Sequence, residues 1–461
     1  MRFVLTCLIS GLLAVSAQAE TRVPASQAEI SLSFAPLVKE AAPAVVNIFA
    51  NRVVEQRISP FRGNSLFEEL FGNRGRTRSR VQNSLGSGVI LSEDGIVVSN
   101  YHVVGMATEI RVVLKDRRQY EARVLLADRE SDLAILKIES DTPLPWLALR
   151  DSDKVEVGEL VLAIGNPFGI GQTVSSGIIS GLARSGIATG NARGYFLQTD
   201  APINPGNSGG ALIDTSGRLL GVNTSILTRS GGSNGVGFAI PANLVARFVE
   251  QAKEGQEEFQ RPWAGIIGQS VDYELAEGFG LSVPEGVVIS AMDAASPFAR
   301  AGLKPGDIVM SVDGQDVNAP PEMLFRMSVR RIGEDIEVRY LSKGEERMAQ
   351  VPLIVAPDLP PRDVRTVEPG LALSGLTVAN LNPKLRAELG IPVGTKGVIV
   401  TEIRGTARST GLRRGDILRE INGVTVRTSE DVVSIAADAD TRRWRVDGLR
   451  GGKRFSYRFR I

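Results

Sequence analysis

The chain has 461 residues, of which 43% are hydrophobic and 5% aromatic, enough apolar material for two to four packed domains. Lys plus Arg (53) almost equals Asp plus Glu (52), so no overall charge favours nucleic acid as a partner. The 49 glycines and few aromatic residues indicate many tight turns, and therefore β-rich domains.

The first 19 residues have the pattern of a secretory signal peptide. Arg2 precedes an apolar run over residues 3–15, and Ala-Gln-Ala at 17–19 is a small-residue cleavage motif. A transmembrane helix needs about 20 apolar residues, which this run does not reach. We expect cleavage after Ala19, export, and no integral membrane segment in the mature chain. Because Cys7 is the only cysteine, the mature chain is expected to contain no disulfide.

Residues 81–240 alternate short apolar runs with turn signals. The stretch GVILSEDGIVVSN (88–100) reads as two strands joined by a turn at Asp94-Gly95, which is typical of a hairpin. Strands this short and regular favour a sandwich or barrel over alternating strand–helix units. In PANLVARFVEQAKEG (241–255) the period changes to that of a helix, and we expect this helix to close the first domain.

The C-terminal part contains an internal repeat. AGLKPGDIVMSVDGQDV (301–317) and TGLRRGDILREINGVTV (410–426) share seven identical residues at an offset of 109 positions. A period near 100 residues indicates duplicated whole domains, because solenoid repeats are much shorter. The proline-rich segment 354–364 reads as the linker between them.

One stretch has the residues for nucleophilic catalysis. DAPINPGNSGGAL (200–212) places Ser208 between Asn207 and two glycines. A serine hydroxyl needs a nearby base to become a good nucleophile, and the resulting oxyanion needs donors that are fixed in advance. The N–H groups of Gly206 and Ser208 are the candidate oxyanion hole. Alone, a glycine-rich loop of this kind is more often a plain turn.

His102, in SNYHVVGMA (99–107), is the only histidine of the chain and follows a predicted strand. A third group, a carboxylate, must orient the imidazole and stabilise its cation. Asp132, in RESDLAILKI (129–138), begins an apolar strand and would be partly buried, so it needs a partner such as the imidazole N–H. Asp128 is the alternative, but it lies among charges and reads as a solvated turn.

The order His102, Asp132, Ser208 is that of chymotrypsin-like double barrels. With SNYHVV, SDLAILKI, NPGNSGGAL and the two Gly-Leu/Gly-Asp repeats, the chain resembles the Do/HtrA family of periplasmic serine proteases over essentially its whole mature length. The resemblance implies a mainly β fold, with a chymotrypsin-like double β-barrel protease domain over 20–258 and PDZ domains over 259–357 and 358–461.

The resemblance also implies an activity. We expect an ATP-independent serine endopeptidase with a His102–Asp132–Ser208 triad that degrades misfolded or unfolded exported proteins and has chaperone activity. The alternatives are a holdase chaperone or a PDZ-based peptide sensor in which proteolysis is secondary. We expect no cofactor, no metal and no nucleic-acid partner. A homotrimer or a higher oligomer of trimers is a family expectation only.

Residues 59–80 combine three phenylalanines with five arginines. Composition alone is as consistent with a disordered basic loop as with a functional one. In the family, a long loop at this position reaches a neighbouring subunit's active site and suppresses it, so the resemblance implies a regulatory loop here.

The substrate pocket is expected to be apolar. Proteases of this fold that cut after Lys or Arg carry an Asp six residues before the nucleophile, whereas this chain has Pro202 there. We therefore expect cleavage after small aliphatic residues such as Val or Ala. The residues that we assign to substrate binding are Ile203, Gly206, Asn207, Thr224 and Ile226.

The PDZ resemblance implies binding of C-terminal peptides by strand addition, with the peptide carboxylate held by a backbone nest. In the first PDZ domain the expected carboxylate loop is Trp263, Ala264, Gly265 and Ile266. In the second, LALSGLTV (371–378) is a weaker match, so this domain either binds peptides or serves in subunit contacts.

Overall fold

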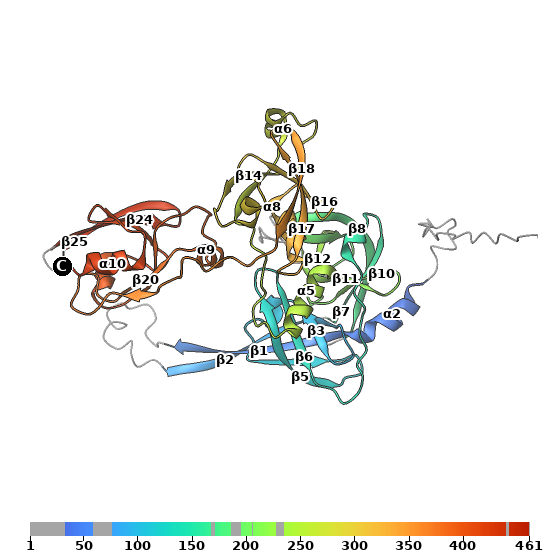
Figure 1. Cartoon of the computed structure of the whole chain (residues 1–461). Helices are drawn as coiled ribbons and strands as arrows, with labels where there is room; N and C mark the ends of the chain where they lie inside the picture. Colours follow the sequence, from blue (N-terminus) through green and yellow to red (C-terminus); the bar gives the residue numbers. More distant parts are fainter. Residues whose placement is uncertain are drawn as a thin grey trace, which may run out of the picture.

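The computed structural model describes residues 33–58, 76–166, 171–185, 195–204, 206–226, 235–438 and 442–460. Two closed β-barrels are followed along the chain by two open sheets (Figure 1). The expected mainly β fold with a double barrel is confirmed.

The first barrel closes in the strand order β1-β2-β3-β6-β5-β4. Its strands are β1 (Val45–Ile58), β2 (Arg76–Ile90), β3 (Ile96–Ser99), β4 (Glu109–Val113), β5 (Gln119–Asp128) and β6 (Leu133–Ile138). β4 alternates exposed and buried residues, as a strand with one face on the core requires. The predicted hairpin is present, because Val89 of β2 pairs with Val98 of β3 and Gly95 adopts a positive φ in the turn.

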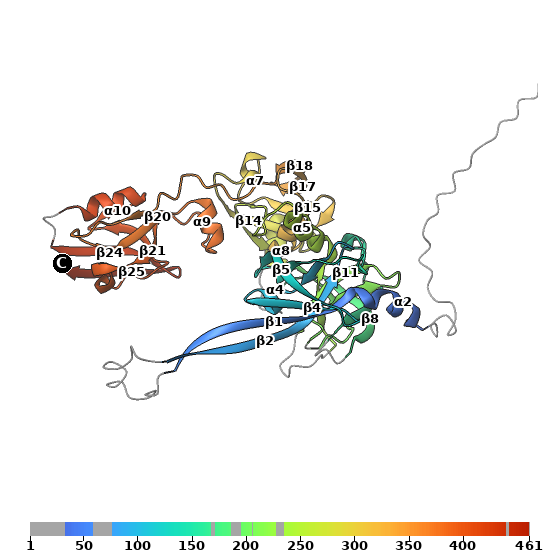
Figure 2. The ribbon, with the colours of Figure 1, turned by 90° about the horizontal axis from the view of Figure 1, so that it is seen from below.

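Strands β1 and β2 continue beyond the barrel as a two-stranded ribbon (Figure 2). Their pairing runs without a register shift from Val45↔Val89 to Ile58↔Arg76. The loop expected at 59–80 is therefore too long at its C-terminal end, because residues 76–80 pair with 54–58 in the ladder. The remainder of that segment, 59–75, lies outside the described residues.

The second barrel closes in the order β10-β11-β12-β9-β8-β7. Its strands are β7 (Leu160–Gly165), β8 (Thr173–Ser185), β9 (Tyr195–Thr199), β10 (Ala211–Asp214), β11 (Leu219–Ile226) and β12 (Gly237–Pro241). The predicted closing helix is α5 (Ala242–Lys253), which begins after Pro241 and buries Leu244, Val245 and Phe248. One apolar cluster joins α5 to both barrels, so the barrels share a core.

Short helices connect these strands. They are α2 (Ala35–Ala41) and the 3₁₀ turn η1 (Ala42–Ala44) before β1, α4 (Tyr101–Val104) after β3, and the 3₁₀ turn η3 (Ser152–Lys154) before β7.

The two C-terminal sheets have the strand orders β13-β14-β15-β17-β18 and β19-β20-β21-β22-β24-β25, so the second repeats the order of the first and adds the edge strand β19. The first contains β13 (Ile266–Ser270), β14 (Val287–Met292), β15 (Ile308–Val312), β16 (Gln315–Asp316), β17 (Asp335–Ser342) and β18 (Glu345–Pro352), with helices α6 (Tyr273–Phe279), α7 (Pro297–Arg300) and α8 (Pro320–Ser328). The second contains β19 (Arg365–Thr366), β20 (Leu376–Asn380), β21 (Val398–Ile403), β22 (Ile417–Ile421), β23 (Val424–Thr425), β24 (Arg443–Arg450) and β25 (Lys453–Arg460), with α9 (Pro383–Glu388), the 3₁₀ helix η5 (Gly405–Thr410) and α10 (Ser429–Ala436).

The repeated motif of the sequence forms the same hydrogen-bonded turn in both sheets. Asp307 accepts a hydrogen bond from the Lys304 N–H, and Asp416, 109 residues later, accepts one from the Arg413 N–H, both at 2.8 Å. The repeated Gly-Asp motif is thus a turn stabilised by its own carboxylate.

The first C-terminal sheet is docked on the second barrel through α8. Phe325 stacks on Tyr195 of β9 with ring centroids 3.9 Å apart and planes 9° apart. The neighbouring Arg326 donates to the Tyr195 hydroxyl at 3.1 Å and forms an ion pair with Asp153. Stacked rings and a buried arginine at one joint favour a fixed position of α8.

Candidate active site

His102 is placed by the end of a fully buried strand. β3 ends at Ser99, and the buried Asn100 directly precedes the short helix α4, whose second residue is His102. The prediction that His102 follows a strand is confirmed. The imidazole is about half exposed, so it keeps contact with solvent.

Asp132 lies in the turn between β5 and β6 and faces His102. Its Oδ2 is 2.8 Å and its Oδ1 3.0 Å from His102 Nδ1, and Oδ1 also accepts from the His102 backbone N–H at 3.0 Å. Asp132 has a φ of 54°, a left-handed conformation that Asp tolerates better than most residues. The Asn100 amide donates to the Asp132 carbonyl at 2.9 Å and holds this turn.

Thr224, on β11 of the second barrel, donates its hydroxyl to Asp132 Oδ2 at 2.6 Å. The sequence assigned Thr224 to substrate binding, but its buried side chain contacts the carboxylate that orients the histidine. The carboxylate is therefore held from both barrels, by His102 of the first and by Thr224 of the second. No local pattern in the sequence signals this contact, because 92 residues separate the two partners.

Ser208 lies in the loop between β9 and β10. Its hydroxyl donates to the carbonyl oxygen of Thr224 at 2.8 Å, and among the described residues it has no hydrogen bond with His102. Gly206 has a φ of 96°, which only a glycine adopts readily. In the part of the chain that the structure describes, the N–H groups of Gly206 and Ser208 donate to no carbonyl, which leaves both available to a ligand.

A buried serine of the first barrel, Ser87, fixes this loop. Its hydroxyl donates to the Gly206 carbonyl at 2.7 Å and accepts from the Asn166 N–H at 2.8 Å. Its backbone N–H donates to the Ser208 carbonyl at 2.8 Å, and its own carbonyl accepts from the Ser99 hydroxyl at 2.8 Å. The carbonyl groups of Gly206 and Ser208, one on each side of Asn207, are therefore anchored to one residue that is 0% exposed. Sequence reasoning missed Ser87, which is 121 positions from Ser208.

The close approach of these segments depends on Gly209. A Cβ atom at this position would lie 2.1 Å from the Ser87 carbonyl oxygen and 2.6 Å from the Ser99 hydroxyl. Gly209 also has a φ of 83°. Any larger residue would push the loop away from the first barrel.

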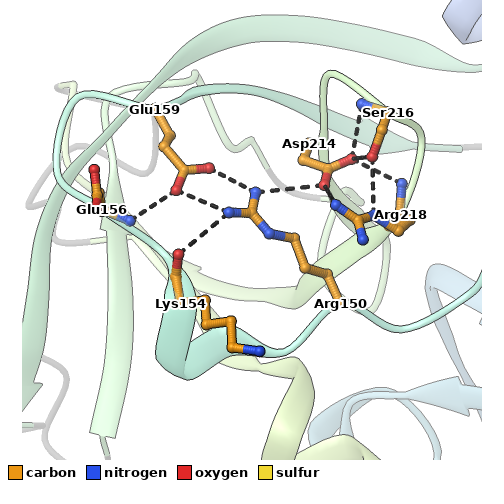
Figure 3. A network of polar contacts seen from close by, with 7 residues as sticks. All are labelled: Arg150, Lys154, Glu156, Glu159, Asp214, Ser216 and Arg218. Carbon is orange, nitrogen blue, oxygen red and sulfur yellow. Dashed lines mark hydrogen bonds and ion pairs between the residues drawn. The ribbon is translucent and has the colours of Figure 1, made fainter. Parts of the chain in front are cut away.

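Strand β10, which directly follows the loop, is anchored at its far end by a polar network (Figure 3). Asp214, whose side chain is 4% exposed, accepts from Ser216, from the backbone and guanidinium of Arg218, and from Arg150 at 3.4 Å. Arg150 in turn makes a two-pronged contact with Glu159, at 2.6 and 2.9 Å. Hydrogen bonding to Glu159 raises the pKa of Arg150 above its ordinary value, so the guanidinium stays protonated.

Comparison with known proteins agrees with this geometry. Residues 86–222 match the trypsin-like peptidase domain, and residues 258–353 match the PDZ domain. The chain is 38% identical over 432 residues to the probable periplasmic serine endoprotease DegP-like of Halomonas elongata, with 88% of each chain covered. The chain belongs to the HtrA family of serine endoproteases.

Other relatives agree with that membership. The periplasmic pH-dependent serine endoprotease DegQ of Escherichia coli K12 is 35% identical, and the match covers 92% of this chain and 91% of that protein. Among solved structures, the HtrA-type protease AlgW with decapeptide is 36% identical, with a TM-score of 0.53, and covers 71% of this chain and 99% of its own. This HtrA chain is thus a serine endopeptidase with C-terminal PDZ domains, named PDZ1 (the β13–β18 sheet) and PDZ2 (the β19–β25 sheet) below.

The residues that the sequence assigned to the substrate pocket have different surroundings. Ile203 is buried, and its side chain lies against Gly237 of β12. Asn207 is buried and accepts from the Thr173 hydroxyl at 2.8 Å. The backbone of Ile226 pairs with Gly237, but its side chain lies outside the described part of the structure. Asp200 accepts from the Ile178 N–H at 2.7 Å, so this carboxylate is already engaged in the barrel.

The predicted carboxylate loop leads into β13, the first strand of PDZ1. The Gly265 carbonyl accepts from the Asp293 N–H at 2.8 Å, and the Ala264 carbonyl accepts from the Ser296 hydroxyl at 2.6 Å. Gly265 has a φ of 65°, and a Cβ atom there would lie 2.7 Å from the Trp263 ring. The loop therefore requires glycine at this position.

A cavity of about 710 Å³ lies beside this loop. Its walls come from the protease domain, PDZ1 and PDZ2, and include Ser131, Trp263, Gly265, Ser328 and Pro383. The prediction that Asp128 is a solvated turn residue is wrong, because its side chain is only 15% exposed and forms an ion pair with Arg261 in this wall. Charges that are close in the chain need not be solvated when another domain covers them.

None of the helices in the described ranges has the length and apolar character to cross a membrane. Within the same residues, no three or more His, Cys, Asp and Glu side chains gather in a way that could hold a metal ion.

Proposed function

We propose that His102, Asp132 and Ser208 are the catalytic triad of this serine endopeptidase. The observation that carries the proposal is the 2.8 Å contact between His102 Nδ1 and Asp132 Oδ2, beside the loop that presents Ser208. Asp132 holds the imidazole in the tautomer with a proton on Nδ1, which leaves Nε2 free to act as a base.

The proposed reaction is acyl transfer in two steps. His102 Nε2 takes the proton of the Ser208 hydroxyl while Oγ attacks the peptide carbonyl carbon, and the Gly206 and Ser208 N–H groups stabilise the oxyanion. His102 then gives that proton to the leaving amine as the C–N bond breaks, which leaves an acyl-enzyme. Water, deprotonated by His102, releases the acyl group and restores Ser208.

The hydrogen bond from Ser208 to the Thr224 carbonyl indicates a resting arrangement. Before attack, the hydroxyl proton must turn from that carbonyl toward His102, which requires at the least a rotation about the Cβ–Oγ bond. A bound peptide substrate would supply the energy for this change through contacts made only in the reactive state.

We infer that the substrates are unfolded exported proteins, cut without ATP after small aliphatic residues in the periplasm. The signal-peptide pattern of residues 1–19, Pro202 at the sixth position before Ser208 and the periplasmic relatives support this inference. We also propose that PDZ1 binds C-terminal peptides through residues 263–266 and that the enzyme works as a trimer or a larger assembly of trimers. The domain limits 20–258, 259–357 and 358–461 are part of the same proposal.

A chaperone activity is the second candidate function. The cavity beside the Gly265 loop, about 710 Å³ and walled by three domains, supports a molecule that can hold a peptide. Tyr101 and Ser131, the neighbours of His102 and Asp132 in the chain, line this cavity, but no triad residue does. A form that cannot cut would still hold clients there.

The test compares the wild type with Ser208→Ala on a reduced, unfolded protein without ATP. We expect the variant to lose cutting by up to about a millionfold, as for triad members in other serine proteases. Thr173→Ala is the matched control, since it removes a hydroxyl near the same loop but none from the triad. Cutting that persists in Ser208→Ala would overturn the triad. Suppression of client aggregation by Ser208→Ala would support the chaperone activity, and no suppression would count against it.

A further inference from the structure

PDZ2 reaches the peptide loop of PDZ1 through helix α9, which lies on the side of PDZ2 that is turned toward PDZ1 (Figures 1 and 2). Arg386 of α9 forms an ion pair with Asp293 of PDZ1, and the two side chains are only 13% and 12% exposed. The Asp293 N–H donates to the Gly265 carbonyl, so a single residue joins α9 to the loop 263–266. Because separation of a buried ion pair is costly, α9 has a preferred place at this joint.

PDZ1 contains the equivalent helix without such a contact. Asn382 caps α9 and Asp272 caps α6, each by accepting from the third backbone N–H after it at 2.9 Å. Counted from these caps, Ala276 of α6 has the place of Arg386. None of the α6 residues, all of which the structure describes, lines the cavity beside Gly265. The fold of the repeat therefore needs no arginine at this position.

That cavity is the carboxylate end of the expected peptide groove of PDZ1, because its walls include Gly265 of the loop and Leu324 of α8. β13 is the edge strand of its sheet, and α8 lies beside it, since a Cβ atom on Gly268 would lie 3.4 Å from Pro320. A peptide that adds to this edge would run between β13 and α8. Within the described residues, the N–H groups of Ala264 and Gly265 donate to no carbonyl, so both are available to a carboxylate.

PDZ2 closes this end of the groove with a mostly apolar surface. We call residues 383–393, which comprise α9 and the turn after it, the PDZ2 wall. The two charged wall residues that line the cavity are already paired, Arg386 with Asp293 and Glu388 with Arg362. The larger apolar residues of the wall that line the cavity are Pro383, Ile391, Pro392 and Val393. Such a surface suits an apolar side chain better than a charged one.

The protease side of the cavity adds charges of both signs, so it selects no strongly charged ligand. Its charged residues are Arg129 and Arg261 against Asp128, Glu130 and Glu258, and Arg261 is paired with Asp128. The volume of about 710 Å³ lies within the range of ligand pockets, about 300–1,000 Å³. These features together favour a peptide C-terminus whose carboxylate meets backbone N–H groups and whose last side chain is apolar.

We propose that the PDZ2 wall completes the peptide site of PDZ1 and contacts the apolar last side chain of a bound C-terminal peptide. This rests on the proposed function, in which PDZ1 binds C-terminal peptides through residues 263–266. The peptide backbone pairs with β13, its carboxylate accepts from the loop, and its last side chain lies against Ile391 and Val393. The affinity for a peptide then depends on PDZ2, and a bound peptide holds PDZ2 against PDZ1.

The test measures, by fluorescence anisotropy, how the full-length protein binds two labelled ten-residue peptides, one that ends in Val and one that ends in Ala. All proteins carry Ser208→Ala, so that the peptides are not cut. Val393→Ser removes two methyl groups from the wall, each worth about fourfold in affinity when buried, so we expect a loss of roughly tenfold for the peptide that ends in Val. The shorter Ala side chain does not reach the wall, so its peptide should bind both proteins equally.

Val433→Ser is the matched control, because this half-buried valine of α10 packs against the PDZ2 core and does not line the cavity. It should bind both peptides like the wild type. Arg386→Gln removes the ion pair with Asp293 and lets the wall move away, so the peptide that ends in Val should bind several-fold more weakly. Tighter binding in Arg386→Gln would make PDZ2 a lid over the site and would overturn the proposal.

Gly265→Val tests PDZ1 by itself. A side chain at a φ of 65°, 2.7 Å from the Trp263 ring, distorts the loop and should abolish binding of both peptides. If the wild type binds neither peptide, or if Gly265→Val binds both normally, the PDZ1 function and the PDZ2 wall are both wrong. If Gly265→Val abolishes binding while Val393→Ser and Val433→Ser do not differ, PDZ1 still binds peptides and the proposal for the PDZ2 wall alone is wrong.

Discussion

Removal of the Ser87 hydroxyl tests how the nucleophile loop is held. In Ser87→Ala, the partly buried Gly206 carbonyl and the buried Asn166 N–H each lose a hydrogen-bond partner. An unsatisfied buried polar group costs about 1–3 kcal/mol, so we expect a loss of about 2–4 kcal/mol in the free energy of unfolding. The same loss of anchoring lets the Gly206 and Ser208 N–H groups move away from the oxyanion position.

The effect on catalysis is expected in kcat. If about half of the lost energy is expressed as misplacement of the oxyanion donors, kcat falls roughly fivefold to thirtyfold, while KM changes little. The assay is steady-state cleavage of a peptide substrate, with thermal unfolding measured in parallel. The pH–rate profile should keep its shape, because Ser87 does not contact His102.

Ser99→Ala is the matched control for this prediction. Ser99 is equally buried, and its hydroxyl donates to the Ser87 carbonyl, not to the nucleophile loop. We expect a comparable loss of stability with kcat nearly unchanged. If both variants lose activity in proportion to stability, or if Ser87→Ala retains full kcat, the argument that Ser87 positions the loop is refuted.

Three further predictions concern other parts of the molecule. Thr224→Val removes one donor from Asp132 at nearly constant volume, and we expect kcat to fall about tenfold, the effect of losing about 1.4 kcal/mol of orientation; an unchanged kcat would show that His102 alone suffices to hold the carboxylate. Arg150→Gln breaks the contact with Glu159 and should lower the free energy of unfolding by about 1–3 kcal/mol. Chemical unfolding with equal midpoints for variant and wild type would contradict this value. Two backbone N–H groups lower the pKa of Asp431 below 3.8, so its stabilising contribution is present above that pH and is lost as the pH falls below it. In Asp431→Asn, the free energy of unfolding of PDZ2 should therefore depend less on pH in acid. If the curves of unfolding free energy against pH stay parallel for variant and wild type, Asp431 does not make this contribution.

The local elements of this protein could be predicted from its sequence. The turn at Asp94-Gly95, the helix over 242–253 and the duplicated Gly-Asp motif are set by residues within a few positions of one another. Side-chain period and turn chemistry report such short-range preferences directly. The choice of His102 and Asp132 depended on their places beside predicted strands and on the family resemblance, and the structure places them 2.8 Å apart.

Only the tertiary structure decided which distant residues meet. Ser87 holds the Ser208 loop, Thr224 holds Asp132, and Arg261 covers Asp128, across separations of 121, 92 and 133 residues. A single sequence carries no periodic signal for such pairs, because any serine or threonine on a buried strand would look the same. The partner is fixed by which strands the two barrels bring together and by the need of each buried polar group for a hydrogen bond. That need is satisfied only after the chain has folded, so it is a property of the assembled barrels and not of any local stretch.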